Sequence, residues 1–277
     1  MRWALCIAVL TGCVSCDSTE ETQAKIQQEH LLRVRALVIK DIESHRDGVS
    51  LAADKLSPGF VLRDPKTRER EMRAALKFLQ DPRKGIEAFV ASPMTFLAAV
   101  GSDGVVIARD RKPDRMKGQD YGVRFDVVAR ALKGSANVGL GEFFAKDPKE
   151  PSSWSILFAA PSARKGKMVG AAVVGIPLSR MAQRLSRQLR VENAAEIQRG
   201  LGLWTYLYKG DRIFHWDTPP ELDALLPSGE ERAGKLAASP EGFMGEVRVH
   251  GALFVYGVFP LPELGPDVGV LIFRSEP

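Results

Sequence analysis

Cysteine is confined to the first 16 residues of this chain, at Cys6, Cys13 and Cys16. The remaining sequence therefore has no internal disulfide, no Cys-x-x-Cys metal site and no cysteine nucleophile. A body without cysteine suits a chain that is exported to an oxidising compartment, because unwanted disulfides cannot form in it.

Patterns for metal binding and catalysis are also missing. The four histidines, at positions 30, 45, 215 and 250, lie far apart, and no two have the i, i+4 spacing of a helical zinc site. There is no G-x-S-x-G elbow, H-E-x-x-H motif or P-loop. His215 lies two residues from Asp217, but no serine or cysteine is placed to complete a nucleophile set. The sequence thus predicts a protein that is not an enzyme and needs no cofactor.

Charge and hydropathy argue against two further classes. The net charge is +5, and the basic residues are interspersed with acidic ones rather than gathered in a stripe with aromatic residues, which argues against nucleic-acid binding. No run reaches 18 consecutive apolar residues, about the length that a membrane-spanning helix needs. With 277 residues, 45% of them hydrophobic, the chain has the composition of one large or two small globular domains.

The N-terminus resembles a lipoprotein signal peptide. An arginine at position 2 is followed by an apolar run over 3–10 and by the letters LTGC over 10–13, which are similar to the bacterial lipobox. The resemblance implies a signal peptide over 1–12, acylation of the Cys13 thiol, and a polar tether over 13–21. The alternatives are acylation at Cys16 and an ordinary cleaved signal peptide.

The residue after the acylated cysteine bears on localisation. Val14 follows Cys13 and permits sorting to the outer membrane, whereas Asp17 follows Cys16 and would favour retention in the inner membrane. Two or three acyl chains anchor a protein firmly. We therefore expect a lipid anchor that holds the protein at the periplasmic face of a bacterial membrane, with the outer membrane preferred.

Two helices are expected before the first strand, within a helical segment over 22–95. The stretch 22–56 carries an apolar stripe at helical spacing and is expected to end at Ser57-Pro58-Gly59. Asp64 and Pro65 fit the N-cap and first position of a second helix, which runs to Gln80. The long first helix either forms a signalling or dimerising stalk or packs along its own domains.

The stretch from Phe96 to Leu178 organises the rest of the chain. It predicts a hairpin over 96–108, a helix that ends at Gly134, and a second hairpin over 156–176. The polar segment 109–119 between them is expected to be a solvated loop. A basic amphipathic helix over 179–198 follows, either as a connector or as a surface for anionic lipid. Residues 96–200 thus form an antiparallel sheet with helical cover.

A similar pattern restarts at Gly202. Strand, turn and strand are expected over 203–216, followed by a short helix capped by Thr218. Three more strands are expected over 246–250, 253–260 and 268–273. Because no strong helix is evident between these strands, we expect 201–277 to form a second, smaller module of the same kind.

The combination resembles the Cache family, the extracytoplasmic relatives of PAS sensor domains. The matching stretches are DGVVIA from Asp103, GQD from Gly118, the helix end at Gly134, and the run from Ala159 to Leu178. The resemblance covers 96–200 and, more loosely, 201–275. It implies an α+β fold, in which a long N-terminal helix is followed by two PAS-like antiparallel sheet modules with helical cover, a double-Cache arrangement.

The resemblance also places a ligand site beneath the loop and helix that follow the first hairpin. In amino-acid-binding Cache domains an arginine there binds the ligand carboxylate in bidentate fashion beside paired aromatic residues. The candidate ligand-binding residues are Arg109, Tyr121, Arg124, Phe125, Trp154 and Phe158. For Trp154 and Phe158, a place in the plain core is the alternative.

Two departures from that pattern bear on the ligand. Val127 and Val128 stand where the aromatic pair is expected, and Pro177 stands where those domains carry the aspartate that holds the ligand ammonium. We therefore expect a carboxylate, another anion or an apolar molecule rather than an α-amino acid.

The function expected from these features is a membrane-anchored, periplasmic small-molecule-binding or sensing module of Cache type. No kinase, methyl-accepting or cyclase segment follows the final expected strand, so we expect the signal to pass to a separate partner protein. The alternative is a structural or protein-interaction lipoprotein that keeps the fold, with Phe or Met side chains filling its pocket.

Overall fold

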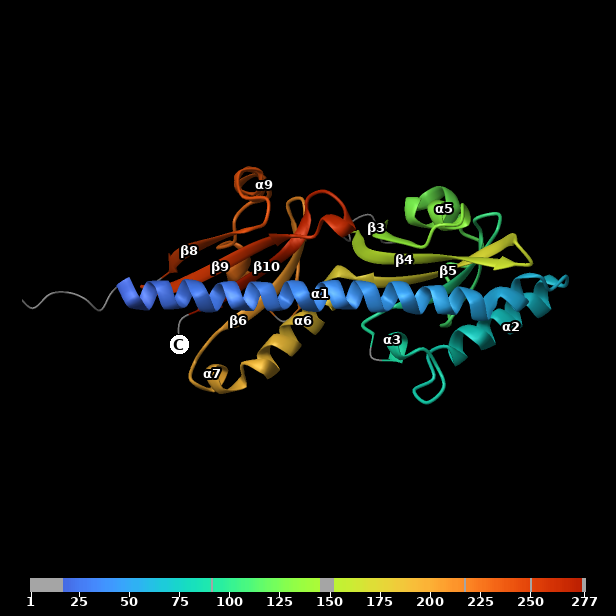
Figure 1. Ribbon diagram of the computed structural model, residues 1–277, viewed down its shortest axis with the longest axis horizontal. Helices are drawn as coiled ribbons and strands as arrows, with labels where there is room; N and C mark the ends of the chain where they lie inside the picture. The colour runs from blue at the N-terminus through green and yellow to red at the C-terminus, as the bar shows by residue number, and fades with distance from the viewer. Residues whose placement is uncertain (1–16, 91, 145–151, 217, 250, 276–277) are drawn as a thin grey trace, which may run out of the picture.

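The structure, a computed structural model, describes residues 17–90, 92–144, 152–216, 218–249 and 251–275. It contains two antiparallel sheets that lie end to end along one helix (Figure 1). The α+β architecture expected from the sequence, with a long N-terminal helix and two sheet modules, is confirmed.

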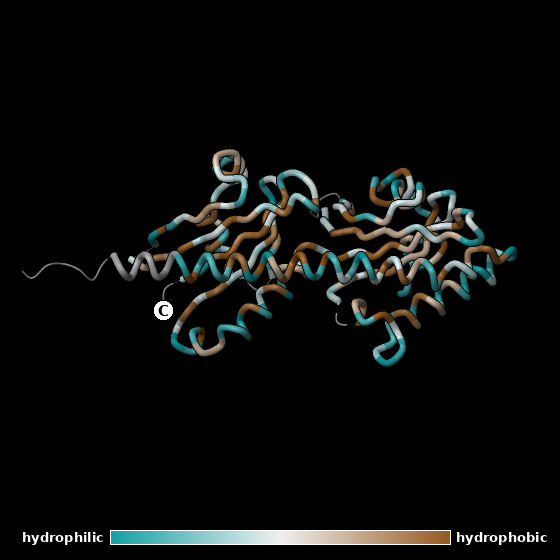
Figure 2. Tube along the Cα trace, in the orientation of Figure 1, coloured by the Kyte–Doolittle hydropathy of each residue, from teal (hydrophilic) through white to brown (hydrophobic). Residues whose placement is uncertain are grey.

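Helix α1 (Asp17–Phe60) runs the length of the molecule and packs against both sheets (Figure 1). Hydrophobic and hydrophilic residues alternate along α1 (Figure 2), and its buried apolar residues belong to the core beneath the two sheets. The helix begins inside the segment expected as a tether and continues beyond the expected stop at Pro58. Proline removes only one backbone donor, and the last turn is held by tertiary packing because Phe60 is buried against Gly170 of the first sheet.

The two sheets have the same strand order. The first lobe contains β1 (Phe96–Gly101), β2 (Val106–Arg109), β3 (Asn137–Phe143), β4 (Ser153–Arg164) and β5 (Lys167–Pro177), in the order β2-β1-β5-β4-β3. The second lobe contains β6 (Leu203–Lys209), β7 (Arg212–Phe214), β8 (Phe243–Val249), β9 (Ala252–Pro260) and β10 (Val268–Ser275), in the order β7-β6-β10-β9-β8. The second sheet therefore repeats the complete strand topology of the first.

Shorter helices cover the sheets and connect the lobes. They are α2 (Pro65–Phe78), α3 (Glu87–Val90), α4 (Tyr121–Arg124), α5 (Asp126–Leu132), α6 (Leu178–Glu192), α7 (Ala194–Gln198), α8 (Pro220–Asp223), α9 (Gly229–Ala238) and the 3₁₀ turn η1 (Pro262–Leu264). Among the described residues, no helix combines the length and apolar composition needed to cross a membrane.

Several local expectations are confirmed, and others need correction. Asp64 caps α2 by accepting a hydrogen bond from the Thr67 amide. The helix expected over 179–198 is interrupted at Asn193, where α6 ends and α7 begins. The N-cap of α8 is Pro219 rather than Thr218. Strand β3 and helix α9 were not expected at all.

Each sheet has two buried faces. The inner faces of both sheets pack against α1 and α6 in one continuous hydrophobic core. The outer face of the first sheet is covered by α4 and α5, and the outer face of the second by α8 and α9 (Figure 1). Each lobe therefore has an enclosed layer between its sheet and its cover helices.

Candidate ligand site of the first lobe

The layer beneath α4 is filled by four aromatic rings, which we call the aromatic cluster: Phe96, Tyr121, Phe125 and Phe143. The Tyr121 and Phe125 rings meet edge to face with centroids 4.9 Å apart, and Phe143 lies 5.1 Å from Phe125 and 5.7 Å from Phe96. Glycines make room for them, because a Cβ on Gly175 would lie 2.1 Å from Cε1 of Phe96. The rings therefore occupy the space in which the resemblance places a ligand.

Arg124 lies at the exposed rim of the aromatic cluster. Its guanidinium carbon is 5.0 Å from the ring centre of Phe125 and 5.3 Å from that of Phe143, within the range of cation–π attraction. One Nη donates a hydrogen bond to the Glu142 carbonyl over 2.9 Å. Helix α4 holds Arg124 in place, since Asp120 caps that helix by accepting a hydrogen bond from the Val123 amide.

Two buried polar atoms of this layer lack hydrogen-bond partners among the described residues. They are the Tyr121 hydroxyl, on a side chain that is 0% exposed, and Nε of Arg109, which lies 3.9 Å from Oδ1 of Asp110, within ion-pair range but beyond hydrogen-bond distance. Arg109 pairs with Ala98 across β1 and β2, which places it on the outer face with the aromatic cluster. Its Nη2 donates to the Thr95 carbonyl over 3.3 Å.

The charge state of Tyr121 follows from this environment. Burial raises the pKa of the phenol to about 12, and the positive charges of Arg124 and Arg109 only partly oppose that effect. The hydroxyl therefore stays protonated at neutral pH and is a hydrogen-bond donor. With two guanidinium groups nearby, the region favours an anionic acceptor.

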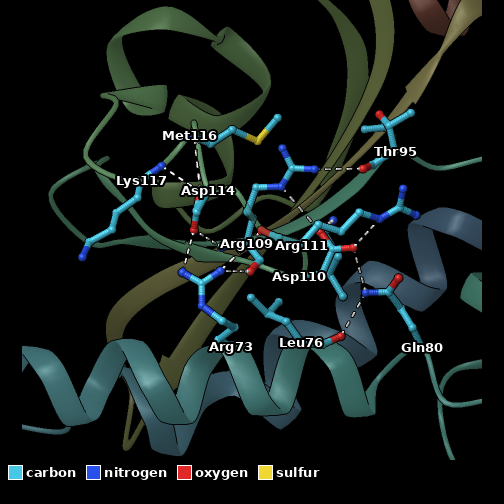
Figure 3. A network of polar contacts seen from close by, with 12 residues as sticks. Arg73, Leu76, Gln80, Thr95, Arg109, Asp110, Arg111, Asp114, Met116 and Lys117 are labelled. Atoms are coloured by element: carbon cyan, nitrogen blue, oxygen red, sulfur yellow. Dashed lines mark hydrogen bonds and ion pairs between the residues drawn. The ribbon is translucent and has the colours of Figure 1, made fainter.

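The polar loop over 109–119 is largely exposed, and hydrogen bonds also fasten it to α2 (Figure 3). Asp114 accepts hydrogen bonds from the amides of Arg109, Met116 and Lys117 and from the guanidinium of Arg73, over 2.9–3.2 Å. This network fixes the backbone at Arg109 and so fixes where its side chain begins.

Asp110 fastens the start of the same loop. Its carboxylate is buried and accepts hydrogen bonds from the Leu97 amide over 3.1 Å and from Gln80 Nε2 over 3.2 Å (Figure 3). The loop is therefore held from both the sheet and α2.

The six candidate residues do not lie together. Arg109, Tyr121, Arg124 and Phe125 surround the outer layer, as described above. Trp154 and Phe158 project from β4 to the inner face, where Phe158 is stacked on His45 of α1 with ring centres 5.4 Å apart. Successive residues of a strand point to opposite faces, and on β4 it is Leu157 and Ala159 that face outward.

Sequence reasoning missed Phe96 and Phe143 as members of this layer. Phe143 belongs to the unexpected strand β3, so nothing indicated its position. Phe96 begins the first strand, and its partner across β5 is Gly175, a pairing that only the register of the sheet reveals.

Two other features of the sequence analysis have separate outcomes. Cys13 and the signal-peptide segment lie outside the described residues, and so does Asp217. His215 instead contacts Asp223, with Nε2 and Oδ2 2.9 Å apart. No group of three or more metal-binding side chains occurs in the described part of the chain.

Solved structures with the same arrangement of elements are sensory domains. The sensory domain of the Campylobacter jejuni chemoreceptor Tlp3, solved with isoleucine bound, aligns with a TM-score of 0.60 over 96% of this chain and 97% of that one, at 12% identity. The sensor domain of the V. cholerae histidine kinase DctB aligns with a TM-score of 0.56 over 94% and 98%, at 13% identity. The fold is that of a double-Cache sensor domain.

The likeness is one of fold, because identities of this size do not carry a ligand or a residue's role from one chain to another. No protein-family model and no curated protein matches the sequence. Any ligand of this chain must therefore be argued from its own side chains.

Proposed function

We propose that this double-Cache domain is a sensing module that binds a small carboxylate-bearing molecule in its first lobe. The anion-binding groups are Arg109, Tyr121 and Arg124, at the edge of the aromatic cluster. The observation that carries the proposal is a pair of buried donors that make no hydrogen bond within the described residues, Nε of Arg109 and the Tyr121 hydroxyl, on the same face of one sheet.

The energetic argument is that a buried donor without a partner is costly, by about 1–3 kcal/mol. A carboxylate supplies acceptors for such donors, and a guanidinium matches its geometry in bidentate fashion. Arg124 is exposed at the rim, so its guanidinium is the first group that an entering anion meets. Pro177 at the end of β5 has no charge and no side-chain acceptor for an ammonium group, which favours a carboxylate over an α-amino acid at this site.

The proposed setting is the periplasmic face of a bacterial membrane, with the chain held by lipid on Cys13. Helix α1 begins at Asp17, four residues after Cys13, and its first turns lie beside the second lobe (Figure 1). The second lobe would then be nearer the membrane and the first lobe further out. In this arrangement α1, which contacts both lobes, would carry a ligand-induced change towards a separate partner protein.

The same layer also supports a second candidate function. The aromatic cluster occupies the space beneath α4, as a domain that keeps the fold without a ligand would have it. On this alternative the protein is an interaction module of the envelope, and its contacts with another protein replace ligand binding.

Thermal-shift and calorimetric titrations of the chain from residue 22 would separate the two functions. The probes are acetate, propionate, pyruvate and succinate, with amino acids, amines and purines as comparison classes. A ligand that binds only the folded state stabilises it by mass action, by about 2.7 kcal/mol at a hundredfold excess over its Kd. The melting temperature rises accordingly. Arg124→Ala should weaken carboxylate binding about tenfold or more, since a hydrogen bond to a charged group contributes about 1.5–3 kcal/mol.

The matched control is Arg130→Ala, which removes the same charge from the exposed side of α5 and should leave binding unchanged. Tyr121→Phe removes only the hydroxyl and should weaken binding while keeping the ring packing. Binding that survives both Arg124→Ala and Tyr121→Phe would move the site elsewhere. No shift with any probe would favour the interaction module, and cross-linking in cells would then identify its partner.

A further inference from the structure

The second lobe contains a cavity that plays no part in the site proposed above. It measures about 330 Å³ and lies between the start of α9 and the turn that joins β6 to β7, on the outer side of the second sheet. Its charged and larger lining residues are Tyr208, Asp211, Glu230, Arg232, Leu236 and Asp267. The volume falls at the lower end of the usual range for ligand pockets, about 300–1,000 Å³, and fits a compact molecule.

Arg232 of α9 is a buried cation in the wall of this cavity. The residue is 2% exposed, yet in the described part of the chain no carboxylate oxygen lies within 4 Å of its guanidinium. The guanidinium donates to the carbonyls of Gly210, over 2.5 Å, and Pro227, and its carbon lies 4.6 Å from the ring centre of Tyr208. These contacts hold it in place but do not neutralise it.

One donor of that guanidinium remains unused, because Nε is buried without a partner among the described residues. Burial lowers the pKa of Arg232, and the nearby Tyr208, Asp211 and Glu231 only partly compensate. A buried charge is retained at little cost only when it is paired. The missing partner is an anionic group, and the cavity is the space beside Arg232 in which one fits.

Tyr208 supplies a second donor of the same kind. Its side chain is 3% exposed and its hydroxyl has no hydrogen-bond partner in the described residues. The ring lies across the neighbouring strand, since a Cβ on Gly269 would lie 2.2 Å from the hydroxyl oxygen. Burial raises the pKa of the phenol to about 12, so the hydroxyl is protonated and can donate.

The rest of the lining carries the opposite charge. Asp211, Glu230 and Asp267, which are exposed, contribute three carboxylates to the lining. A phosphate or dicarboxylate would meet repulsion from these acids, and a simple amine would meet the buried arginine. A molecule that carries one charge of each sign satisfies both parts of the lining.

We propose that this cavity binds a small zwitterion. Its anionic oxygen accepts hydrogen bonds from Arg232 and Tyr208, and its cationic nitrogen faces the carboxylates of Asp211, Glu230 and Asp267. The second lobe is then a ligand-binding module in its own right, with a different ligand class from that of the first lobe.

The test is isothermal titration of the folded Arg124→Ala variant, in which the first-lobe site is disabled. The probes are glycine, β-alanine and 4-aminobutyrate, with propionate and propylamine as analogues that keep only one of the two charges. At least one zwitterion should bind at least tenfold more tightly than either single-charge analogue. Equal affinity for a zwitterion and its analogues, or no binding of any zwitterion at millimolar concentration, would overturn the proposal.

Two conservative variants assign the contacts without removing the buried arginine. Tyr208→Phe keeps the ring and should weaken binding of the zwitterion about tenfold. Tyr256→Phe, a control on the same face of the sheet, should leave that binding unchanged. Asp267→Asn keeps the side-chain volume at a left-handed backbone position, φ 56°, which asparagine tolerates. Asp267→Asn should weaken the binding of zwitterions but not that of propionate. Unchanged binding in both Tyr208→Phe and Asp267→Asn would refute the site, whatever the outcome for the first lobe.

Discussion

Replacing Asp114 by alanine should destabilise the first lobe by about 2–4 kcal/mol. The carboxylate is 7% exposed and accepts four hydrogen bonds, three from backbone amides of its own loop and one from Arg73. Each hydrogen bond to a charged group contributes about 1.5–3 kcal/mol. The sum is an upper bound, because Arg73 keeps its bonds to Glu69 and to the Arg109 carbonyl and water can reach part of the freed loop.

The effect should depend on pH in a defined direction. Burial by itself would raise the pKa of Asp114, but the amides of Arg109, Lys117 and Met116 and the guanidinium of Arg73 outweigh it and lower that pKa. The stabilisation is therefore fully present above the unfolded-state pKa of about 3.9 and is lost as the pH falls through the lower folded-state value. The difference between the wild type and Asp114→Ala should accordingly shrink below about pH 4.

Urea denaturation at pH 7 and pH 3, together with hydrogen exchange of residues 109–119, provides the measurement. For a chain of this size, each kcal/mol lost from the free energy of unfolding lowers the melting temperature by about 2–4 °C. The melting temperature of Asp114→Ala should therefore be several degrees lower at pH 7. Asp47→Ala, on an exposed position of α1, is the control and should change stability little. A loss below about 0.5 kcal/mol, or an equal loss at both pH values, would refute the reasoning. Because the loop positions Arg109, carboxylate binding should weaken as well.

Two further predictions concern close packing and a buried histidine. Gly175→Ala places a methyl group 2.1 Å from the Phe96 ring and should lower the free energy of unfolding, measured by urea denaturation, by about 1–3 kcal/mol. Phe96→Leu in the same chain should recover part of that loss. Additive effects of the two substitutions would contradict the proposed clash. Burial is the main reason that the pKa of His45 is lowered, with its contact to the Asp41 carbonyl opposing it, so stability should fall as the pH drops below about 6.5. His45→Gln should make the slope of unfolding free energy between pH 5 and pH 7 shallower, and an unchanged slope would rule out His45 as its source.

Local structure could largely be predicted from the sequence wherever a helix end or a turn has its own sequence signal. Gly134 follows the C-cap of α5 with φ 102°, a left-handed conformation that glycine adopts without strain. Asp64 caps α2. Helix α9 also had such a signal, because Ser228 caps it and Glu231 stands three residues later, the spacing of a capping box. That signal was overlooked.

Strand β3 had no comparable signal. Its sequence, NVGLGEF, contains asparagine and two glycines, which are depleted in strands. The segment is a strand because it pairs with β4 along its whole length. Glycine is needed at position 141, because a Cβ there would lie 2.4 Å from Leu157 and 3.0 Å from the Phe125 ring. Long-range pairing and ring packing decide the conformation, and neither is visible in a window of seven residues.

The sequence by itself determined the class of fold, the two hairpin-and-helix repeats, and Arg109, Tyr121, Arg124 and Phe125 as residues of one region. These depend on residues that are neighbours in the chain. Only the tertiary structure decided that Trp154 and Phe158 face α1, because both faces of β4 are buried and no polar alternation marks inside from outside. It alone placed Phe96 and Phe143 in the aromatic cluster and buried Arg232 beside a cavity in the second lobe, since contacts between distant segments set both.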